Sequence, residues 1–383
     1  MPFAFAALLV SFLVTLVLVR AGVRAGIRSA GRALLDTSRR NPWTRDTHLH
    51  GWGRTGGLGV FLGLAVALAL RWGADHPEAT VLLGLLSAAS VVFLAGLADD
   101  FTQRVRGMVR LLAAIASAWL AGTWVGAWVP RVDVPVLDAL LSPGLALLLS
   151  CLLVAGITNA FNIIDGFNGL AGGVATIILL GIAYVAFKVS DTLVVAGAIT
   201  AIGAIAGFLF FNFPRGMVFL GDGGAYFLGF WIGELLILLV ARNPEVSAWF
   251  PLMLCAYPTC ELLFSIYRRA FVRRAHPGMP DIAHLHHLIY MRLVRWLAGG
   301  HLPERHMIRN SLTAPYLWAI TSIAVAPAVV FWESTHLLQL GALLFAAGYV
   351  YAYLRIVRFR SPRWWVLRNS RPAHPSKSEG NKP

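Results

Sequence analysis

Four acidic side chains stand out in this largely apolar sequence because of where they fall. Asp99 and Asp100 end one apolar run. Asp165 follows a second run, and Asp222 precedes a third. Carboxylates bind Mg²⁺ and accept protons, and either role would offset the cost of placing the Asp99-Asp100 pair at a helix C-terminus, which disfavours anions. The alternative is a solvated pair beside arginines, and in either case adjacent helical residues, which point about 100° apart, should differ in their contacts.

Amide side chains surround Asp165. The same stretch contains Asn159, Asn162 and Asn168, and its glycines permit tight turns before the next apolar run. Asn159 and Asn162 share one face at helical spacing, and the start of the following helix could offer N–H groups to a phosphate. A glycine-rich turn with capping side chains is the alternative, which three amides and a carboxylate in one stretch disfavour. For Asp222 considered alone, a helix N-cap is a strong alternative to a metal ligand.

A basic cluster precedes the second apolar run. It contains Arg45 and His48, followed by Arg54 and the pair Gly56-Gly57. Arg54 and the first N–H groups of the helix would face an anion such as a phosphate. The alternative is that these arginines only set the topology of the chain.

Three histidines form the last cluster. His284, His286 and His287 follow Asp281 in a His-x-His-His motif. Zinc is disfavoured, because only Asp281 lies close enough in sequence to complete a tetrahedral site. Contact with a phosphate or a sugar is the better interpretation.

Helices that cross a membrane must position all of these residues. Of the 383 residues 58% are hydrophobic and only 13% are charged, against about 25% charged in soluble domains. Spanning segments must be helical, because lipid cannot satisfy free backbone groups. The expected fold class is therefore all-α, a polytopic helical bundle. Its eleven predicted spans are Phe3–Val19, Gly56–Trp72, Thr80–Ala98, Met108–Val129, Pro143–Ala160, Leu170–Lys188, Thr192–Phe211, Ala225–Val240, Ser247–Tyr267, Thr313–Trp332 and His336–Leu354.

Basic residues orient this bundle. All but four of the 32 lysines and arginines fall on one side of the eleven-span topology. The positive-inside rule makes that side cytoplasmic, with a periplasmic N-terminus and a cytoplasmic C-terminus. The five polar clusters, which played no part in this assignment, all fall on the same side, which predicts a single site there. We expect a membrane domain over residues 1–355 and a basic, disordered tail over residues 356–383.

The net charge of +14 does not indicate nucleic-acid binding, because the basic residues lie between apolar runs rather than in a domain of their own. They are better suited to lipid headgroups and phosphorylated substrates. Glu234 lies in the middle of an apolar run, where a buried acid often marks an ion path. A transporter is therefore the alternative from another class, although a transporter would place its polar groups near the midplane rather than at one interface.

In this order, the clusters resemble the bacterial polyprenyl-phosphate sugar-1-phosphate transferases, a family that includes the phospho-N-acetylmuramoyl-pentapeptide and undecaprenyl-phosphate N-acetylglucosamine-1-phosphate enzymes. The resemblance covers roughly Asp36 to Arg295. Each motif is weak alone, but five in order on one predicted side are specific. The motifs are Arg45-x-x-His48 with Arg54-x-Gly56-Gly57, Asp99-Asp100, Asn159-Ala-x-Asn162-x-x-Asp165-Gly166, Gly221-Asp222-Gly223 and His284-x-His286-His287.

The resemblance implies transfer of a sugar-1-phosphate from a UDP-sugar to undecaprenyl phosphate with release of UMP, and Mg²⁺ as cofactor with Mn²⁺ as an alternative. It implies metal ligation by Asp222 together with one of Asp99 and Asp100, of which Asp99 is the ligand that we expect. It also implies catalytic roles for Asp99, Asp100 and Asp165. The substrate-binding residues that it implies are Asn159, Asn162, Asn168, His284, His286, His287, Arg54 and His48.

Details of the motifs refine this expectation. The His-x-His-His form is similar to the N-acetylglucosamine branch, which implies a UDP-N-acetylhexosamine and the start of a surface glycan such as O-antigen or capsule. Asn168 stands where many members have an aspartate, so we expect polar contacts to nucleotide or sugar from it rather than charge. The usual Asp-Arg before the histidines is absent, since Ile282 follows Asp281. The expected location is the bacterial inner membrane with a cytoplasmic site, and the oligomeric state is left open between a monomer and a homodimer.

Overall fold

The computed structural model describes residues 1–33, 52–272, 284–294 and 303–358, and the regular elements in these ranges are all helices. The predicted all-α fold class is confirmed for this part of the chain. Arg45, His48 and Asp281 lie outside the described residues, as does the predicted tail from residue 359 onward.

Ten helices in the described ranges are long and apolar enough to cross a membrane. Each corresponds to one of the predicted spans, with ends that differ, and together they make the chain a multi-pass membrane protein. They are α1 (Pro2–Ala33), α2 (Gly56–Gly73), α3 (Glu78–Thr102), α4 (Gly107–Val125), α6 (Pro143–Ile164), α7 (Leu170–Lys188), α8 (Thr192–Asn212), α9 (Gly221–Arg242), α13 (Pro303–Val330) and α14 (Thr335–Val357).

The predicted span Ser247–Tyr267 is not a single helix. It forms two short helices, α10 (Phe250–Leu254) and α11 (Ala256–Tyr267), which meet at Cys255. Pro258 explains the break, because it has no N–H to donate to the carbonyl four residues earlier and its ring crowds that carbonyl. The described residues therefore contain ten uninterrupted candidate spans rather than eleven.

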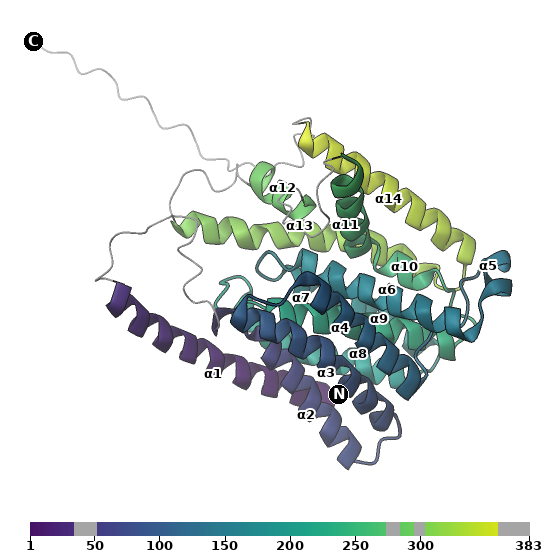
Figure 1. The fold of residues 1–383 in the computed structure, drawn as a ribbon, viewed down its shortest axis with the longest axis horizontal. Coiled ribbons are helices and arrows are strands. Elements are labelled where there is room, and N and C mark those ends of the chain that lie inside the picture. The colour runs from purple at the N-terminus through teal and green to yellow at the C-terminus, as the bar shows by residue number, and fades with distance from the viewer. Residues whose placement is uncertain (34–51, 273–283, 295–302, 359–383) are drawn as a thin grey trace, which may run out of the picture.

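The two short helices nevertheless cover the same length as α14. At one end, the Ser247 hydroxyl lies 2.7 Å from the hydroxyl of Thr335, at the start of α14. At the other end, Arg268 Nη1 donates to the hydroxyl of Tyr353, close to the end of α14, at 3.0 Å. The interrupted segment thus runs alongside α14 from one end of the bundle to the other (Figure 1).

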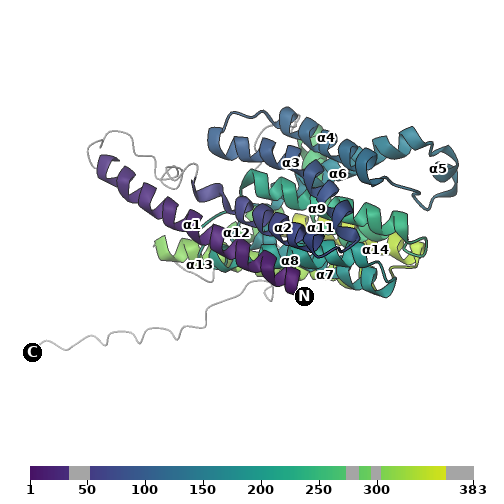
Figure 2. The same cartoon turned by 90° about the horizontal axis from the view of Figure 1, so that it is seen from below.

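Helix α9 forms the centre of the bundle. Nearly all of its residues are buried, and it contacts α2, α3, α6 and α7. The two views show α9 enclosed by other helices, with α1 and α14 toward opposite outer edges (Figures 1 and 2). Asp222 lies in the first turn of α9, so its position is fixed by the best-packed helix of the protein.

The loops that the charge pattern assigns to the periplasmic side lie at the same end of the bundle. Asp133, after α4, accepts hydrogen bonds from Ala248 N at 2.7 Å and from Thr335 Oγ1 at 3.1 Å. Asp191, between α7 and α8, accepts one from Arg242 Nε at 2.8 Å. These contacts join four connections at one end of the bundle. The described polar clusters lie at the opposite end.

Glycines let α2 and α3 approach the first turn of α9 until their backbones touch. A Cβ on Gly57 would lie 2.5 Å from Cα of Gly224, and a Cβ on Gly96 would lie 2.7 Å from Cα of Gly223. Both distances are shorter than any real Cβ contact allows. The glycines beside Asp222 therefore act as packing surfaces as well as turn residues.

Gly57→Ala should lower the thermal unfolding midpoint in detergent, because the added methyl meets backbone atoms, and overpacking of this kind costs about 1–3 kcal/mol. Gly348→Ala on α14 is the matched control, since no atom lies within 4 Å of its added Cβ. Its midpoint should stay constant or rise, because alanine is favoured over glycine within a helix. Equal midpoints for the two variants would contradict the proposed role of this contact.

Candidate active site

Asp222 lies at the centre of a group of charged and amide side chains from four elements. Arg54 Nη2, from the short helix η3 (Trp52–Arg54), donates to its Oδ1 at 2.7 Å. Asn162 Nδ2, from the last turn of α6, donates to the same oxygen at 3.1 Å. Arg110 Nη1, from α4, donates to Oδ2. The structure thus brings three of the predicted clusters to one carboxylate.

Arg110 joins Asp222 to Asp99. Its Nη1 atom donates to Oδ2 of Asp99 at 2.5 Å and to Oδ2 of Asp222. Because one nitrogen contacts both oxygens, these oxygens point at a common position that holds a positive charge. The sequence analysis counted Arg110 only as a topology-setting residue. The sequence feature that could have identified Arg110 as a site residue is its position inside an apolar run, soon after the helix start at Gly107.

Asp100 has a different set of contacts from its neighbour. Only 1% of its surface is exposed, and its two oxygens accept hydrogen bonds from Asp222 N at 2.8 Å and Gly223 N at 2.9 Å. Arg54 Nε lies 3.3 Å from Oδ1. Asp100 on α3 therefore caps the N-terminus of α9 from another helix. The two adjacent aspartates differ in their contacts, as their angular separation led us to expect.

Asp165 follows the last turn of α6 and is partly exposed. Desolvation by the surrounding protein raises the pKa of Asp165 to about 8, and the negative charges of Asp222 and Asp100 add to this effect against the opposing charge of Arg54. Desolvation and the neighbouring carboxylates therefore favour the protonated form of Asp165 in the metal-free protein.

The predicted anion sites at two helix starts are already occupied by protein groups. Gly56 N and Gly57 N donate to the carbonyls of Phe219 and Leu220 at 2.9 and 2.8 Å. At the start of α7, Gly169 N donates to Oδ1 of Asn212 at 2.6 Å and Leu170 N donates to the carbonyl of Phe167 at 3.0 Å. The expectation that these backbone groups face a phosphate was therefore wrong, and the guanidinium of Arg54 is the anion-binding group that η3 supplies.

The three predicted amides differ in where they point. Asn162 contacts Asp222, whereas Asn159 Nδ2 donates to the Ala155 carbonyl of its own helix at 2.7 Å. Asn168 is 3% exposed, and its Nδ2 donates to the Pro214 carbonyl at 3.1 Å. In this structure the Asn168 side chain holds the turn between α6 and α7 rather than facing the carboxylates.

The histidine motif opens α12 (Leu285–Arg292) and reaches the Asp165 turn. A Cβ on Gly166 would lie 3.4 Å from Nε2 of His286. The ring of Phe167 packs edge-on against His286 and His287, with centroid distances of 5.6 and 5.5 Å. Apart from Arg45 and His48, which lie outside the described residues, the predicted clusters are therefore connected to one another.

The donor set suits a divalent cation, although the side chains are paired differently here. No three His, Cys, Asp or Glu residues in the described ranges converge as a ready ligand group. Two guanidinium groups, however, face four carboxyl groups, which leaves a deficit of positive charge when all four are ionised. The Arg110 nitrogen between Asp99 and Asp222 marks a place where two hard oxygen donors already meet, and such donors match Mg²⁺.

The sequence of this chain is similar to those of known proteins. Residues 82–240 match the family model described as Glycosyl transferase family 4. A probable undecaprenyl-phosphate N-acetylglucosaminyl 1-phosphate transferase of Bacillus subtilis is 30% identical over 295 residues, 76% of this chain and 78% of the relative. A decaprenyl-phosphate N-acetylglucosaminephosphotransferase of Mycobacterium tuberculosis is 29% identical over 338 residues, 80% and 79% of the two chains. An undecaprenyl-phosphate alpha-N-acetylglucosaminyl 1-phosphate transferase of Thermotoga maritima is 24% identical over 257 residues, 67% and 74% of the two chains.

Asp100→Asn should destabilise the protein more than Asp99→Asn. An amide offers one acceptor oxygen to the two backbone N–H groups that Asp100 now satisfies, and a buried unsatisfied donor costs about 1–3 kcal/mol. The side chain of Asp99 is 16% exposed and satisfies a single backbone N–H, that of Val105 at 3.0 Å, which the oxygen of an amide can still accept, so Asp99→Asn should leave the thermal midpoint close to that of the wild type. Thermal unfolding of both variants in detergent, without divalent cations, tests this order, and a larger loss for Asp99→Asn would reverse the assignment.

Proposed function

The chain belongs to glycosyl transferase family 4, and on that premise we propose that it transfers a sugar-1-phosphate from a UDP-sugar to undecaprenyl phosphate and releases UMP. The observation that carries the proposal is the group of four carboxyl groups and two arginines around Asp222. Its aspartates all lie within the matched region. The relatives are named for N-acetylglucosamine-1-phosphate transfer, which supports a UDP-N-acetylhexosamine as donor. We propose that the lipid-linked product starts a surface glycan.

The reaction proposed is a direct displacement. An oxygen of the lipid phosphate forms a bond to the sugar-bearing phosphorus, and the bond from that phosphorus to the UMP oxygen breaks. A phosphate monoester has a second pKa of about 6, so the attacking phosphate is mostly dianionic at neutral pH and needs little help from a base. Such transfers depend chiefly on positioning and on neutralising charge.

The residues around Asp222 divide these tasks. Arg54, whose side chain is 42% exposed, can turn its guanidinium toward a diphosphate. Mg²⁺, or Mn²⁺, held by Asp222 and Asp99, would neutralise charge on that diphosphate. Asp165 lies beside Asp222 and Asp100, where desolvation and the charges of these two residues raise its pKa in the metal-free protein, and its carboxyl group would contact the diphosphate or the ion. Asn162 and the histidines of α12 flank the same space and would orient the donor.

Asp222→Asn should reduce turnover by at least about a hundredfold, because it removes charge at the point where the arginines and the ion meet. The assay supplies purified protein with undecaprenyl phosphate, Mg²⁺ and a panel of UDP-sugars, and measures UMP release. Wild-type protein should release UMP with a UDP-N-acetylhexosamine. No UMP release with any UDP-sugar, from protein that is folded, would contradict the proposed function.

We place the active site on the cytoplasmic side of the bacterial inner membrane. The basic residues support this orientation, and so does the interrupted segment α10–α11, which runs alongside α14 and supplies an eleventh crossing. An odd number of crossings would place the two termini on opposite sides, and with the basic residues facing the cytoplasm the N-terminus would be periplasmic and the C-terminus cytoplasmic.

Single cysteines at two exposed positions test this orientation. Asp75→Cys, between α2 and α3, should react with a membrane-impermeant maleimide added to intact spheroplasts, whereas Arg104→Cys, after α3, should react only in inverted vesicles. The unsubstituted protein measures the background from Cys151, Cys255 and Cys260. The opposite pattern of labelling would invert the topology and move the site to the periplasm.

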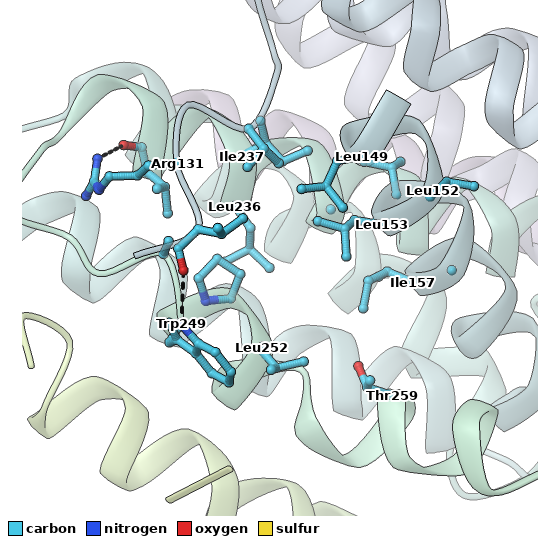
Figure 3. Close-up of a pocket in the computed structure, with 18 of the residues that line it drawn as sticks. Arg131, Leu149, Leu152, Leu153, Ile157, Leu236, Ile237, Trp249, Leu252 and Thr259 are labelled. Carbon is cyan, nitrogen blue, oxygen red and sulfur yellow. Dashed lines mark hydrogen bonds between the residues drawn. The ribbon is translucent and has the colours of Figure 1, made fainter. Parts of the chain in front are cut away.

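An apolar pocket between α6, α9 and α11 could hold part of the isoprenoid chain. Its volume is about 460 Å³, and its lining is almost wholly aliphatic and aromatic. Figure 3 shows Leu149, Leu153 and Ile157 of α6 facing Leu236 and Ile237 of α9 across this space. On α6 the lining residues precede Asn162, which contacts Asp222. The pocket therefore runs along α6 from the end of the bundle that holds Arg131 and Trp249 toward the end that holds the charged site.

Leu153→Trp should fill part of this pocket and raise the KM for undecaprenyl phosphate about fivefold, which corresponds to about 1 kcal/mol, with no change in the KM for the UDP-sugar. Leu148→Trp is the matched control, because Leu148 lies on the same helix with similar exposure but does not line the pocket. Equal effects of the two variants on the KM for undecaprenyl phosphate would show that the pocket does not bind the acceptor.

A further inference from the structure

A buried glutamate lies behind the histidine motif. Glu261, on α11, is 1% exposed. Its Oε2 atom is 3.3 Å from Nδ1 of His284 and accepts a hydrogen bond from Leu285 N at 3.4 Å. Its Oε1 atom is 3.7 Å from Nδ1 of His286. One carboxylate thus contacts both imidazoles and the first N–H of α12.

Burial makes this contact selective for one state of the imidazoles. An isolated charge in a protein interior costs far more than a neutral group, so a buried carboxylate needs positive or N–H partners. In the described part of the chain, the two histidines are the ion-pair partners of Glu261. A carboxylate only accepts hydrogen bonds, so its bond with His284 selects a proton on Nδ1 of that ring. His286 Nδ1 lies beyond hydrogen-bond distance but within ion-pair distance, where the negative charge favours a proton on Nδ1 as well.

The other ring nitrogen of His286, whose side chain is 1% exposed, then lies on the side of the Asp165 turn. Its Nε2 atom lies against Gly166, which directly follows Asp165. The rings of His284 and His286 stack at 5.3 Å with an interplanar angle of 3°. Phe167 packs against the opposite side of the motif. Fixing Nδ1 therefore fixes both the direction and the protonation pattern of the atom that a substrate would meet.

The far end of α12 is also held in place. Arg292 Nη1, at the end of this helix, donates to the carbonyl of Ile356 at 2.6 Å and to that of Val357. These are the last carbonyls of α14, where a cation is favoured. With Glu261 at its start and α14 at its end, α12 is anchored at both termini, so a change at Glu261 should act on the histidines rather than release the whole helix.

We propose that Glu261 is a positioning residue for the transfer reaction: it orients His284 and His286 through their Nδ1 atoms, so that Nε2 of His286 meets the phosphate or sugar of the donor beside Asp165. The proposal rests on the proposed function for its kinetic consequence. It rests on the Glu261–histidine geometry alone for its structural consequence.

Kinetics of Glu261→Gln, in the assay for UMP release, give the first test. Glutamine replaces one of the two carboxylate oxygens with an NH₂ group, which donates rather than accepts and carries no charge, so the imidazole that faces this group loses its preference for a proton on Nδ1. We expect kcat/KM to fall at least tenfold, with partial rescue in Glu261→Asp. Glu234→Gln is the matched control, because Glu234 is also fully buried but lies on α9 away from the histidines. An equal loss in Glu234→Gln would show a general packing effect and overturn the proposal.

A double-mutant cycle separates orientation from independent effects. If Glu261 acts through His286, the variant with both Glu261→Gln and His286→Gln should have a kcat/KM within about threefold of His286→Gln alone. Effects that multiply would show that the glutamate acts by another route.

A spectroscopic readout does not depend on turnover. In protein labelled with ¹⁵N-histidine, Glu261→Gln should change the ring-nitrogen shifts of two histidines from the Nδ1-protonated pattern, and Glu234→Gln should change none. Unchanged histidine shifts in Glu261→Gln would overturn the proposal. If the wild type showed the expected shifts but released no UMP with any UDP-sugar, the proposed function would fail while the pairing of Glu261 with the histidines stood.

Discussion

The hydrogen bonds from the first turn of α9 to Asp100 are the constraint on which the rest of the site depends. Two N–H groups at the start of a buried helix have no partner within their own helix, and a carboxylate from α3 satisfies both. The bond lengths require the two backbones to touch, which only glycine at positions 96 and 223 allows. Once this contact forms, Asp222 has a single place in the bundle, and Arg54, Arg110 and Asn162 pack around it. Chemistry and packing therefore share the same few residues.

Sequence patterns were sufficient for the architecture and for most members of the site. Long apolar runs and alternating basic connections predicted ten of the helices, because bilayer thickness and backbone hydrogen bonding leave few alternatives. The acidic and amide clusters could be recognised because such polar groups are uncommon at the ends of apolar runs. Which cluster contacts which could not be read from the sequence, since that depends on how α2, α3, α4, α6 and α9 cross in three dimensions.

The residues that the sequence analysis missed or misplaced share a physical cause. Arg110 and Glu261 lie inside apolar segments, where a single charge looks like a topology marker or an isolated buried acid until its partner from another helix is known. Asn168 was assigned to substrate by its place in a motif, yet its amide donates to the Pro214 carbonyl, which an aspartate could not do. The departure from the common pattern at this position is thus matched by a local hydrogen bond. In the segment after α9, hydropathy predicted the crossing, but the break at Cys255 follows from the missing N–H of Pro258.

One consequence of the Arg110 contacts concerns exclusive occupancy. A guanidinium nitrogen and a metal ion could not both sit between Asp99 and Asp222, so with the proposed ligands a cation would enter that position only as Arg110 left it. Arrival of the ion and release of the arginine would then be a single event, and the affinity for the ion would be the difference between two attractions rather than the strength of one. The freed guanidinium would keep its charge and could pair with a phosphate oxygen. An internal ion pair of this kind neutralises part of the charge of the free site, and it would couple cation binding to the exposure of an anion-binding group.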